Sequence, residues 1–145
     1  MNTDRYLFRG IATYGLKAGE WIYGSYARNY WNRGEEHGIL PRDGGYNEVD
    51  PKTVGMFTGW TDTSDEKKMV FEGDILEIHM RGKTVRAVVR LGNQWDKSAF
   101  VLMYRSCSWD YMKILGDPFC EVKDFKVVGN VHDGSELAEV YRDVH

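Results

Sequence analysis

The chain has 145 residues, of which 42% are hydrophobic, 14% aromatic and 28% charged, and its formal net charge is −3. A chain of this size folds as one domain or as two small lobes, and it buries about two-thirds of its surface without a disulfide or metal staple. The slight acidic excess argues against a dedicated nucleic-acid binder, which usually has a basic excess, but it does not exclude a local basic face.

Cysteine usage and hydropathy bear on the cellular compartment. Cys107 and Cys120 form neither a metal-ligand pattern nor a disulfide framework, which predicts buried or free thiols in a reducing compartment. No run of residues is long and apolar enough to span a bilayer, and the N-terminus lacks the basic and apolar regions of a secretory signal. We therefore expect a cytoplasmic protein without membrane contact.

Two short strands are predicted near the N-terminus, because residues 5–10 and 21–26 alternate with a period of two. Phe8 lies on one face of the first strand, and Trp21 and Tyr23 lie together on one face of the second. We expect these aromatic side chains to pair across a hairpin.

The next stretch, residues 29–45, is rich in glycine and is predicted to be an irregular loop. Asp50 then caps a brief helical turn, with Pro51 at its first position, where the missing N–H costs nothing. Residues 54–60 predict a strand, and residues 62–68 predict a polar, solvated hairpin loop. That loop lacks the ligand spacing of a calcium-binding EF-hand loop, so we expect no metal there.

The second half of the chain is organised around an acidic turn of Glu72, Gly73 and Asp74, which opens directly into a strand at residues 74–80. Further strands are predicted at residues 84–91, 99–104 and 126–131. The 99–104 strand is apolar on both faces, which predicts the central position in its sheet. Four short strands separated by turns are typical of a small barrel or sandwich.

Alternation assigns the side chains of the first two of these strands to two faces. The inward face is predicted to carry Leu76, Ile78, Met80, Val85, Ala87, Val89 and Leu91. The outward face is predicted to carry Ile75, Glu77, His79, Arg86, Val88 and Arg90. At the end of the chain the period changes to that of a helix, residues 135–144, whose apolar stripe consists of Leu137, Val140, Tyr141 and Val144.

A series of motifs now occurs in order along the chain. They are Phe-Arg-Gly at 8–10, Gly-Glu-Trp-Ile-Tyr-Gly at 19–24, Val-Asp-Pro-Lys-Thr-Val-Gly-Met-Phe-Thr-Gly at 49–59, Phe-Glu-Gly-Asp-Ile-Leu at 71–76 and Val-Val-Gly-Asn-Val-His-Asp at 127–133. This series resembles the successive motifs of the YopX-like proteins, which are phage and prophage proteins, and the resemblance covers nearly the whole chain. It implies a β-rich fold with an SH3-like barrel in the C-terminal half, and it implies no reaction.

The predicted fold class is therefore all-β with one short C-terminal helix. An N-terminal β subdomain spans residues 1–68 and contains the irregular loop 29–45. An SH3-like β-barrel spans residues 69–145 and is closed by the helix at 135–144.

The ionisable residues form no recognisable catalytic or metal-binding pattern. His132 and Asp133 could converge with the turn at Glu72 and Asp74, which would allow an enzyme site. The competing interpretation is that Asp74 ties its own turn through backbone N–H groups. We predict a non-enzymatic protein with no catalytic residue, metal or cofactor, and we keep an enzyme with an unrecognised site as an alternative.

Charge segregation is the best functional signal in the sequence. The segment 81–105 is strongly basic and contains Arg81, Lys83, Arg86, Arg90, Lys97 and Arg105, with Trp95 nearby as a stacking surface. Basic and aromatic side chains on a curved sheet are how small barrels bind single-stranded nucleic acid. The competing interpretation is a solvated face whose cations prevent edge-to-edge aggregation.

Aromatic residues are concentrated before Trp60, in strands too short to bury them all, and surplus aromatic surface is typical of interface cores. We therefore expect a homo-oligomer formed through the N-terminal half. The predicted role is a non-enzymatic phage or prophage accessory protein that acts by binding or assembly in the cytoplasm of a bacterial host. Nucleic acid and a phage or host protein are further candidate partners.

Overall fold

The computed structural model describes residues 7–31, 34–42, 44–80, 82–91, 100–105, 110–114 and 124–141. These residues form antiparallel strands, a short 3-10 helix and a short α-helix, which confirms the mostly-β prediction. The chain divides into two compact units, residues 1–59 and 60–145, which are named unit 1 and unit 2 and are described separately.

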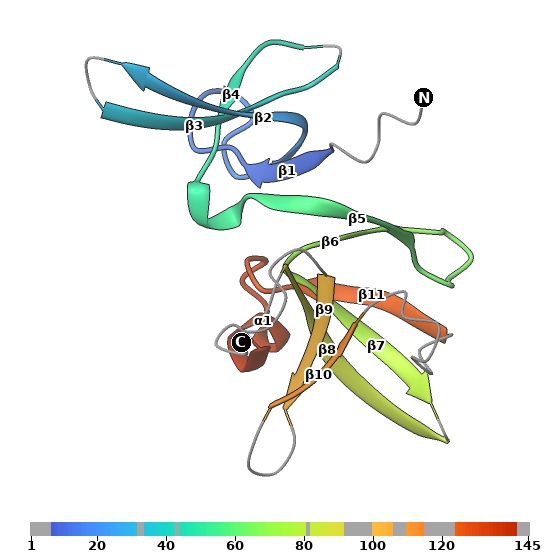
Figure 1. Cartoon of the computed structure of the whole chain (residues 1–145). Helices are drawn as coiled ribbons and strands as arrows, with labels where there is room; N and C mark the ends of the chain where they lie inside the picture. The colour runs from blue at the N-terminus through green and yellow to red at the C-terminus, as the bar shows by residue number, and fades with distance from the viewer. Residues whose placement is uncertain are drawn as a thin grey trace. The chain divides into compact units, whose positions relative to one another are not determined.

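Unit 1 is built on an antiparallel sheet (Figure 1). Its elements are β1 (Phe8–Ile11), β2 (Trp21–Trp31), β3 (Gly34–Leu40), β4 (Asn47–Glu48), the 3-10 helix η2 (Pro51–Thr53) and β5 (Gly55–Thr61). The strand order of this sheet is β4-β3-β2-β1-β5-β6. The end of β5 and all of β6 (Met69–Phe71) belong to unit 2.

The predicted hairpin of the first two strands is confirmed, because β1 pairs antiparallel with β2. The predicted aromatic pairing is wrong, because the register places Gly24 directly opposite Phe8. Phe8 packs edge-on against Tyr26 instead, with ring centroids 5.6 Å apart. The guanidinium of Arg9, which neighbours Phe8 and points to the other face, lies 4.3 Å from the centre of the Trp21 ring.

The predicted irregular loop at residues 29–45 is largely strand, so this prediction is wrong. β2 continues to Trp31 and pairs with β3 up to Gly34, which makes a long hairpin. Two of the glycines that suggested a loop are required in the hairpin for different reasons. Gly34 has a φ of +105°, which favours glycine, and a Cβ at Gly38 would lie only 2.1 Å from the ring of Tyr46. The tyrosine ring thus occupies the space above a strand glycine.

The core of unit 1 is small, and a 3-10 turn closes it. The core cluster consists of Ala12, Ile22, Ile39 and Val49. The predicted cap of the turn is confirmed, since Asp50 Oδ1 accepts a 3.0 Å bond from the backbone N–H of Lys52 and Pro51 is the first residue of η2. Thr53 Oγ1 accepts a 2.9 Å bond from the Ile11 N–H, which joins the turn to the end of β1.

Unit 2 contains a second antiparallel sheet. Its elements after β6 are β7 (Asp74–Met80), β8 (Lys83–Leu91), β9 (Phe100–Arg105), β10 (Asp110–Ile114), β11 (Asp124–Asn130) and α1 (Glu136–Tyr141). The strand order is β10-β9-β8-β7-β11, so β8 is central and the central position predicted for 99–104 is wrong. The SH3-like barrel is not confirmed, because neither sheet closes on itself among the residues described.

One face of this second sheet forms the main core of unit 2. The cluster consists of Val70, Leu76, Ile78, Ala87, Val89, Leu102 and Phe125, with Val85 packed against it. These residues confirm most of the predicted inward positions. Leu91 is an exception, because it lies at the end of β8 and is 39% exposed. The side chain of Met80 lies outside the described part of the chain.

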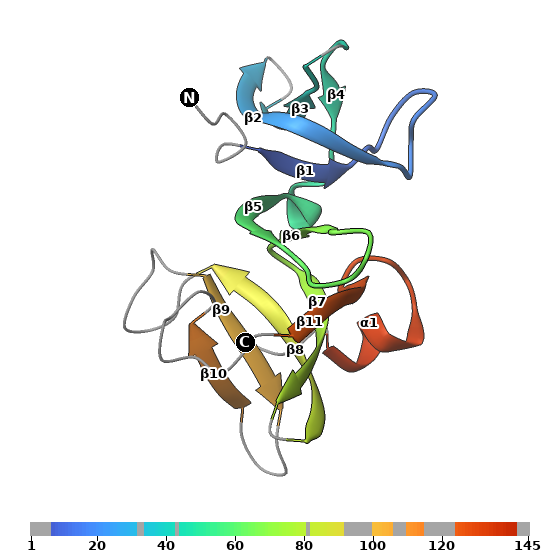
Figure 2. The ribbon, with the colours of Figure 1, turned by 90° about the vertical axis from the view of Figure 1, so that its right-hand side faces the viewer.

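The opposite face was predicted to face outward, but α1 covers part of it (Figure 2). Ile75 and Val88 are fully buried there beside Val131, and Leu137 of α1 packs against them. The outward positions predicted for Ile75 and Val88 are therefore wrong. Alternation along a strand identifies two faces, but it does not show that a later helix will cover one of them.

The C-terminal helix α1 begins at Glu136, one residue after the predicted start at 135. Ser135 caps it, since its Oγ accepts a 3.1 Å bond from the N–H of Ala138. The apolar stripe is only partly confirmed, because Leu137 packs on the sheet while Val140 is 60% exposed and Ala138 is buried in its place. Val144 lies outside the described residues. No helix within the described residues has both the length and the apolar character needed to cross a membrane.

Candidate functional site

The structure describes part of the predicted basic segment. Arg86 and Arg90 lie on the same face of β8, because they are separated by an even number of residues. Lys83 begins β8 and Arg105 ends β9, but their side chains are outside the described part. The remaining members of the predicted set lie wholly outside the described residues; they are Arg81, Trp95 and Lys97.

The carboxylate of Glu77 lies at the centre of the best-defined charged cluster. β7 runs between β8 and β11, and the registers place Arg86 and Lys126 directly opposite Glu77 on its two sides. Arg86 Nη2 is 3.5 Å and Lys126 Nζ is 3.6 Å from the carboxylate oxygens, and His79 Nε2 is 3.7 Å away. Lys126 was not in the predicted set, because only strand register brings it beside Arg86.

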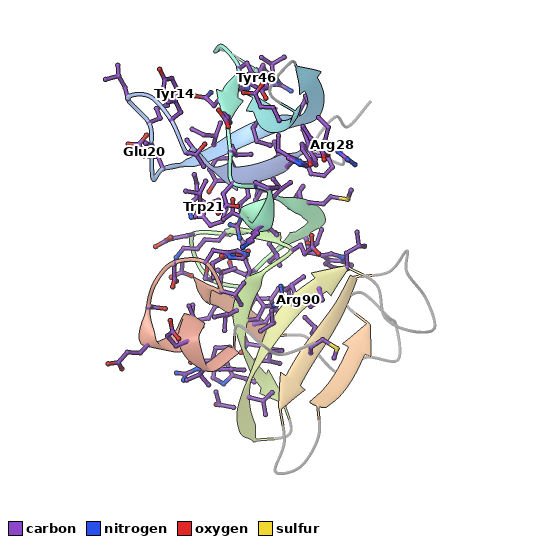
Figure 3. The ribbon with its side chains drawn as sticks, turned by 90° about the vertical axis from the view of Figure 1, so that its left-hand side faces the viewer. Tyr14, Glu20, Trp21, Arg28, Tyr46 and Arg90 are labelled. Atoms are coloured by element: carbon purple, nitrogen blue, oxygen red, sulfur yellow. The ribbon has the colours of Figure 1, made fainter. Side chains whose placement is uncertain are left out.

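Arg90 has a different environment on the same strand (Figure 3). Its side chain is partly buried, and burial lowers the pKa of its guanidinium, while the charge of Glu72 acts in the opposite direction. Glu72 also accepts a 3.4 Å bond from the N–H of Leu91. Glu72 of the predicted structural turn therefore interacts with the last two residues of β8.

Three basic residues form a surface that we call the β8 basic face, namely Arg86, Arg90 and Lys126. Neighbouring acidic side chains reduce the positive potential of this surface. Each arginine has an acidic neighbour, Glu77 or Glu72. The side chains of Arg86 and Lys126 are about half exposed, at 47% and 52%. Exposed ion pairs are weak, so a phosphate can compete for these cations, but the net attraction is smaller than the sequence suggested.

The acid-glycine-acid turn forms a buried corner. Gly73 has a φ of +90°, and its carbonyl accepts a 3.0 Å bond from the N–H of Val131. Asp74 is only 1% exposed; its Oδ2 accepts a 2.8 Å bond from the Phe71 N–H, and its Oδ1 accepts a 3.2 Å bond from the Asn130 side-chain amide. The interpretation that Asp74 ties its own turn is therefore confirmed.

Asn130 links this corner to His132 and Asp133, the two residues that the sequence suggested could come near it. The Asn130 side chain accepts a 2.8 Å bond from the His132 N–H, and the Asn130 N–H donates a 3.0 Å bond to Asp133. Burial by itself raises the pKa of Asp133, but bonds from Ser135 and Asn130 outweigh it and lower that pKa. These bonds join the end of β11 to the start of α1, which is a structural use of the carboxylate.

Asp62 is a buried carboxylate that the sequence did not reveal. Its loop was predicted to be solvated, but Asp62 is only 2% exposed, so that prediction is wrong at this residue. Burial by itself raises its pKa; hydrogen bonds from the Ser64 side chain and from the backbone N–H groups of Val127, Lys68 and Ser64 outweigh this and lower the pKa below 3.8. The pattern Asp-x-Ser at residues 62–64 favours a turn in which the aspartate accepts a bond from the residue two positions later, and it is the local feature that could have indicated this.

A further polar cluster lies on the β2–β3 hairpin of unit 1. The Tyr26 hydroxyl is hydrogen-bonded to Nδ1 of His37, whose Nε2 lies 3.3 Å from the carboxylate of Glu35. Glu35 also forms an ion pair with Arg28. Sequence reasoning missed this cluster, because it depends on the register that places Arg28 opposite His37.

Unit 1 also exposes large apolar side chains, which we call the exposed apolar set. They are Tyr14, Leu16, Tyr23, Leu40 and Tyr46, with exposed fractions of 79%, 106%, 42%, 48% and 39%. Tyr14 lies on the loop between β1 and β2, whereas Arg28 lies toward the far end of β2 (Figure 3). The loop is ordered by backbone bonds, including a 2.8 Å bond from the Gly19 N–H to the Ala12 carbonyl.

No group of three or more histidine, cysteine, aspartate or glutamate side chains is arranged to bind a metal ion in the described parts of either unit. The two cysteines, Cys107 and Cys120, lie outside the described residues. Hydrogen bonds and ion pairs join the residues of the four clusters around Glu77, Asp74, Asp62 and His37.

The fold and these clusters define a mostly-β protein of two antiparallel units, with a buried carboxylate corner in the second. The YopX protein family matches residues 19–139, which is most of the chain and includes β2 to β11. The chain therefore belongs to the YopX family, as the series of motifs indicated. Comparison with curated proteins and with solved structures gave no match.

Proposed function

We propose that this chain is a non-enzymatic accessory protein of a phage or prophage, and that it acts by self-assembly in the host cytoplasm. The observation that supports assembly is the exposed apolar set of unit 1. Such side chains are usual at interface cores, where tyrosine is enriched. The carboxylates of the Asp74 corner accept bonds from backbone N–H groups and from Asn130, which favours a structural over a catalytic role.

The proposed contact surface is the face of the unit 1 sheet that bears Tyr23. Ser25 lies opposite Leu40 in the β2–β3 ladder, and Tyr23 is two residues from Ser25, so Tyr23 and Leu40 share this face. The ring of Tyr46 lies over Gly38 on the same face. Two of these residues are aromatic and the third is aliphatic, so this face of the sheet carries three exposed apolar side chains.

The test is the oligomeric state measured by light scattering at micromolar concentration. The wild type is expected to exceed the monomer mass, and the double variant Tyr23→Thr/Leu40→Thr to associate at least about tenfold more weakly. Threonine suits a strand, so the fold should persist. The matched control is Val140→Thr, which alters an exposed apolar residue of unit 2 and should leave the mass unchanged. A wild type of monomer mass would contradict the proposal.

A second candidate function is binding of single-stranded nucleic acid by the β8 basic face. The observation that favours it is Lys126, which β11 places in one row with Arg86 and so adds a cation to the predicted segment. We choose Arg86→Gln for the test, because a glutamate there would face Glu77 and destabilise the sheet.

Fluorescence anisotropy of a labelled single strand at two salt concentrations tests this second function. Wild-type affinity should fall steeply with salt, and Arg86→Gln should weaken binding and reduce the salt dependence by about one phosphate contact. Lys17→Glu, an exposed change in unit 1, is the control and should have little effect on phosphate-led binding by unit 2. Binding that does not respond to salt would exclude phosphate-led recognition.

A further inference from the structure

The outer edge of β11 is covered by the loop that precedes β6. β11 is the last strand in the order β10-β9-β8-β7-β11, so within the described residues one of its edges has no strand partner. The Phe125 N–H donates a 2.9 Å bond to Thr63 Oγ1, and the Phe125 carbonyl accepts a 2.9 Å bond from the Thr63 N–H. The Val127 N–H donates a 3.0 Å bond to Asp62 Oδ2. The loop therefore takes up the backbone groups that another strand would use.

One carboxylate both shapes this loop and attaches it. Asp62 Oδ1 accepts bonds from Ser64 and a 3.0 Å bond from the N–H of Lys68, which closes the loop on itself. Asp62 Oδ2 is the oxygen that reaches Val127 on β11. Because Asp62 is 2% exposed, water cannot easily replace these bonds. Loss of this side chain would remove the bond to Val127 and loosen the turn, so the loop would be held on β11 by the Thr63 bonds and would open more readily.

If the loop did not cover it, the outer edge of β11 would be well suited to pair with β11 of a second copy. The N–H and carbonyl of Phe125 both point to the outer edge, which is the arrangement of a hydrogen-bonded antiparallel pair. If Phe125 of one copy were opposite Phe125 of another, Asp124 of each copy would lie opposite Lys126 of the other. Both flanking side chains are exposed and opposite in charge, so the two-fold pair is electrostatically complementary.

We propose that residues 62–68 are a strap that masks a strand-pairing surface on β11, and that the occupant of this surface, once the strap is released, is β11 of a second copy. Natural proteins cover or charge their free strand edges to prevent such pairing. The strap covers the edge with Asp62 and Thr63 and turns the exposed residues 65–68, all of them charged, toward solvent. This surface is separate from the unit 1 face proposed for assembly, so either proposal can fail alone.

The first test compares Asp62→Ala with Asp65→Ala by amide hydrogen exchange and light scattering, at a temperature where circular dichroism shows both to be folded. Asp65 is an exposed carboxylate of the same loop, so the control has the same charge change. Asp62→Ala should gain mass relative to the wild type, and its amides at 124–130 should exchange more slowly as concentration rises. Asp65→Ala and the wild type should show no concentration dependence of exchange at 124–130.

A charge reversal then tests the self-pairing register. In the Asp62→Ala background, Asp124→Lys should weaken association by about tenfold, because two like-charged pairs replace two opposite pairs. Adding Lys126→Gln should recover part of the association, because the like charges no longer face each other and no acid is placed opposite Glu77. Rescue by the second change is not expected if the first change only damages the fold.

The proposal is overturned if folded Asp62→Ala keeps the wild-type mass and shows no concentration-dependent protection at 124–130. Association without protection of these residues would also overturn it, because the contact would then lie elsewhere. If Asp62→Ala does not fold, Thr63→Val takes its place. This variant keeps the Asp62 bonds but removes the hydroxyl that accepts from Phe125, and the same two readouts decide.

Discussion

Units 1 and 2 are both antiparallel sheets, but different contacts stabilise them. In unit 1 side chains of neighbouring strands contact each other, as Phe8 contacts Tyr26 and His37 contacts Tyr26. In unit 2 the buried Asp62 and Asp74 accept bonds from backbone N–H groups, and the bond from Val127 to Asp62 joins residues that lie far apart in the chain. Unit 1 also exposes large apolar side chains on one sheet face, whereas α1 covers part of a face in unit 2.

This difference matters for sensitivity to mutation and to pH. A contact between side chains can be replaced by another pair of similar size, because cores tolerate swaps that conserve volume. A buried carboxylate that satisfies backbone donors has no such substitute, because the donors remain when the carboxylate is removed. Unit 2 should therefore be the more fragile of the two to loss of a single polar side chain.

The largest effect is expected from Asp74→Ala in unit 2. The variant leaves the Phe71 N–H and the Asn130 amide without their buried acceptor, and each such loss costs about 1–3 kcal/mol. We expect the free energy of unfolding of unit 2 to fall by about 2–5 kcal/mol, measured by urea denaturation followed through unit 2 amide signals. Asp65→Ala should change it by less than about 0.5 kcal/mol, and equal effects of the two variants would refute the role of the corner.

An intermediate effect is expected from Gly24→Ala in unit 1. A Cβ there would lie 2.2 Å from the backbone oxygen of Leu40, and backbone cannot turn aside as a side chain can. We expect a loss of about 1–3 kcal/mol in the stability of unit 1. Gly45→Ala is the matched control, because nothing lies within 4 Å of its Cβ position. If the two variants have the same melting temperature, the close approach of the Leu40 backbone to Gly24 does not contribute to the stability of unit 1.

The smallest effect is the acid response of unit 2. The pKa of Asp62 in the folded protein is below its ordinary value of 3.8, so the unfolded chain binds the proton more readily. The ionised Asp62 carboxylate therefore stabilises the folded protein fully at pH values well above 3.8. This stabilisation is lost as the pH falls through 3.8 and then through the lower pKa of the folded state. Amide exchange at pH 6 and pH 3 should show unit 2 losing more protection than unit 1.

Two comparisons sharpen the acid prediction. Asp62→Asn removes the titrating group and should flatten the pH dependence of unit 2. The Arg28–Glu35 ion pair of unit 1 is partly exposed and contributes little at any pH, so unit 1 should respond weakly. Equal loss of protection in the two units would contradict the comparison.

Local chemistry could be predicted well from the sequence. Asp50 caps η2 and Ser135 caps α1 through bonds within three residues, so the pattern of neighbouring residues was sufficient. Alternation placed Leu76 and Ile78 in the main core for the same reason, because it is a property of the strand alone. The family was recognisable because its motifs occur in order along the chain, and the match over 19–139 confirms it.

Features that depend on register could not be predicted. Lys126 and Arg86 are 40 positions apart, and they meet at Glu77 because three strands align there. The burial of Asp62 depends in the same way on Val127, which lies 65 positions away. Gly38 was part of the stretch predicted to be a loop, but it is a strand glycine that is needed because the ring of Tyr46 approaches the strand closely.

The sequence by itself determined the mostly-β class, the caps, the alternating core and the family, because each of these follows from residues that are close in the chain or from their order. Tertiary structure alone decided which sheet face α1 covers, which strand lies at the centre and which carboxylates are buried. The physical reason is that burial and pairing depend on which distant strands become neighbours. An aspartate in a polar loop becomes a buried acceptor only when β11 presents an N–H to it.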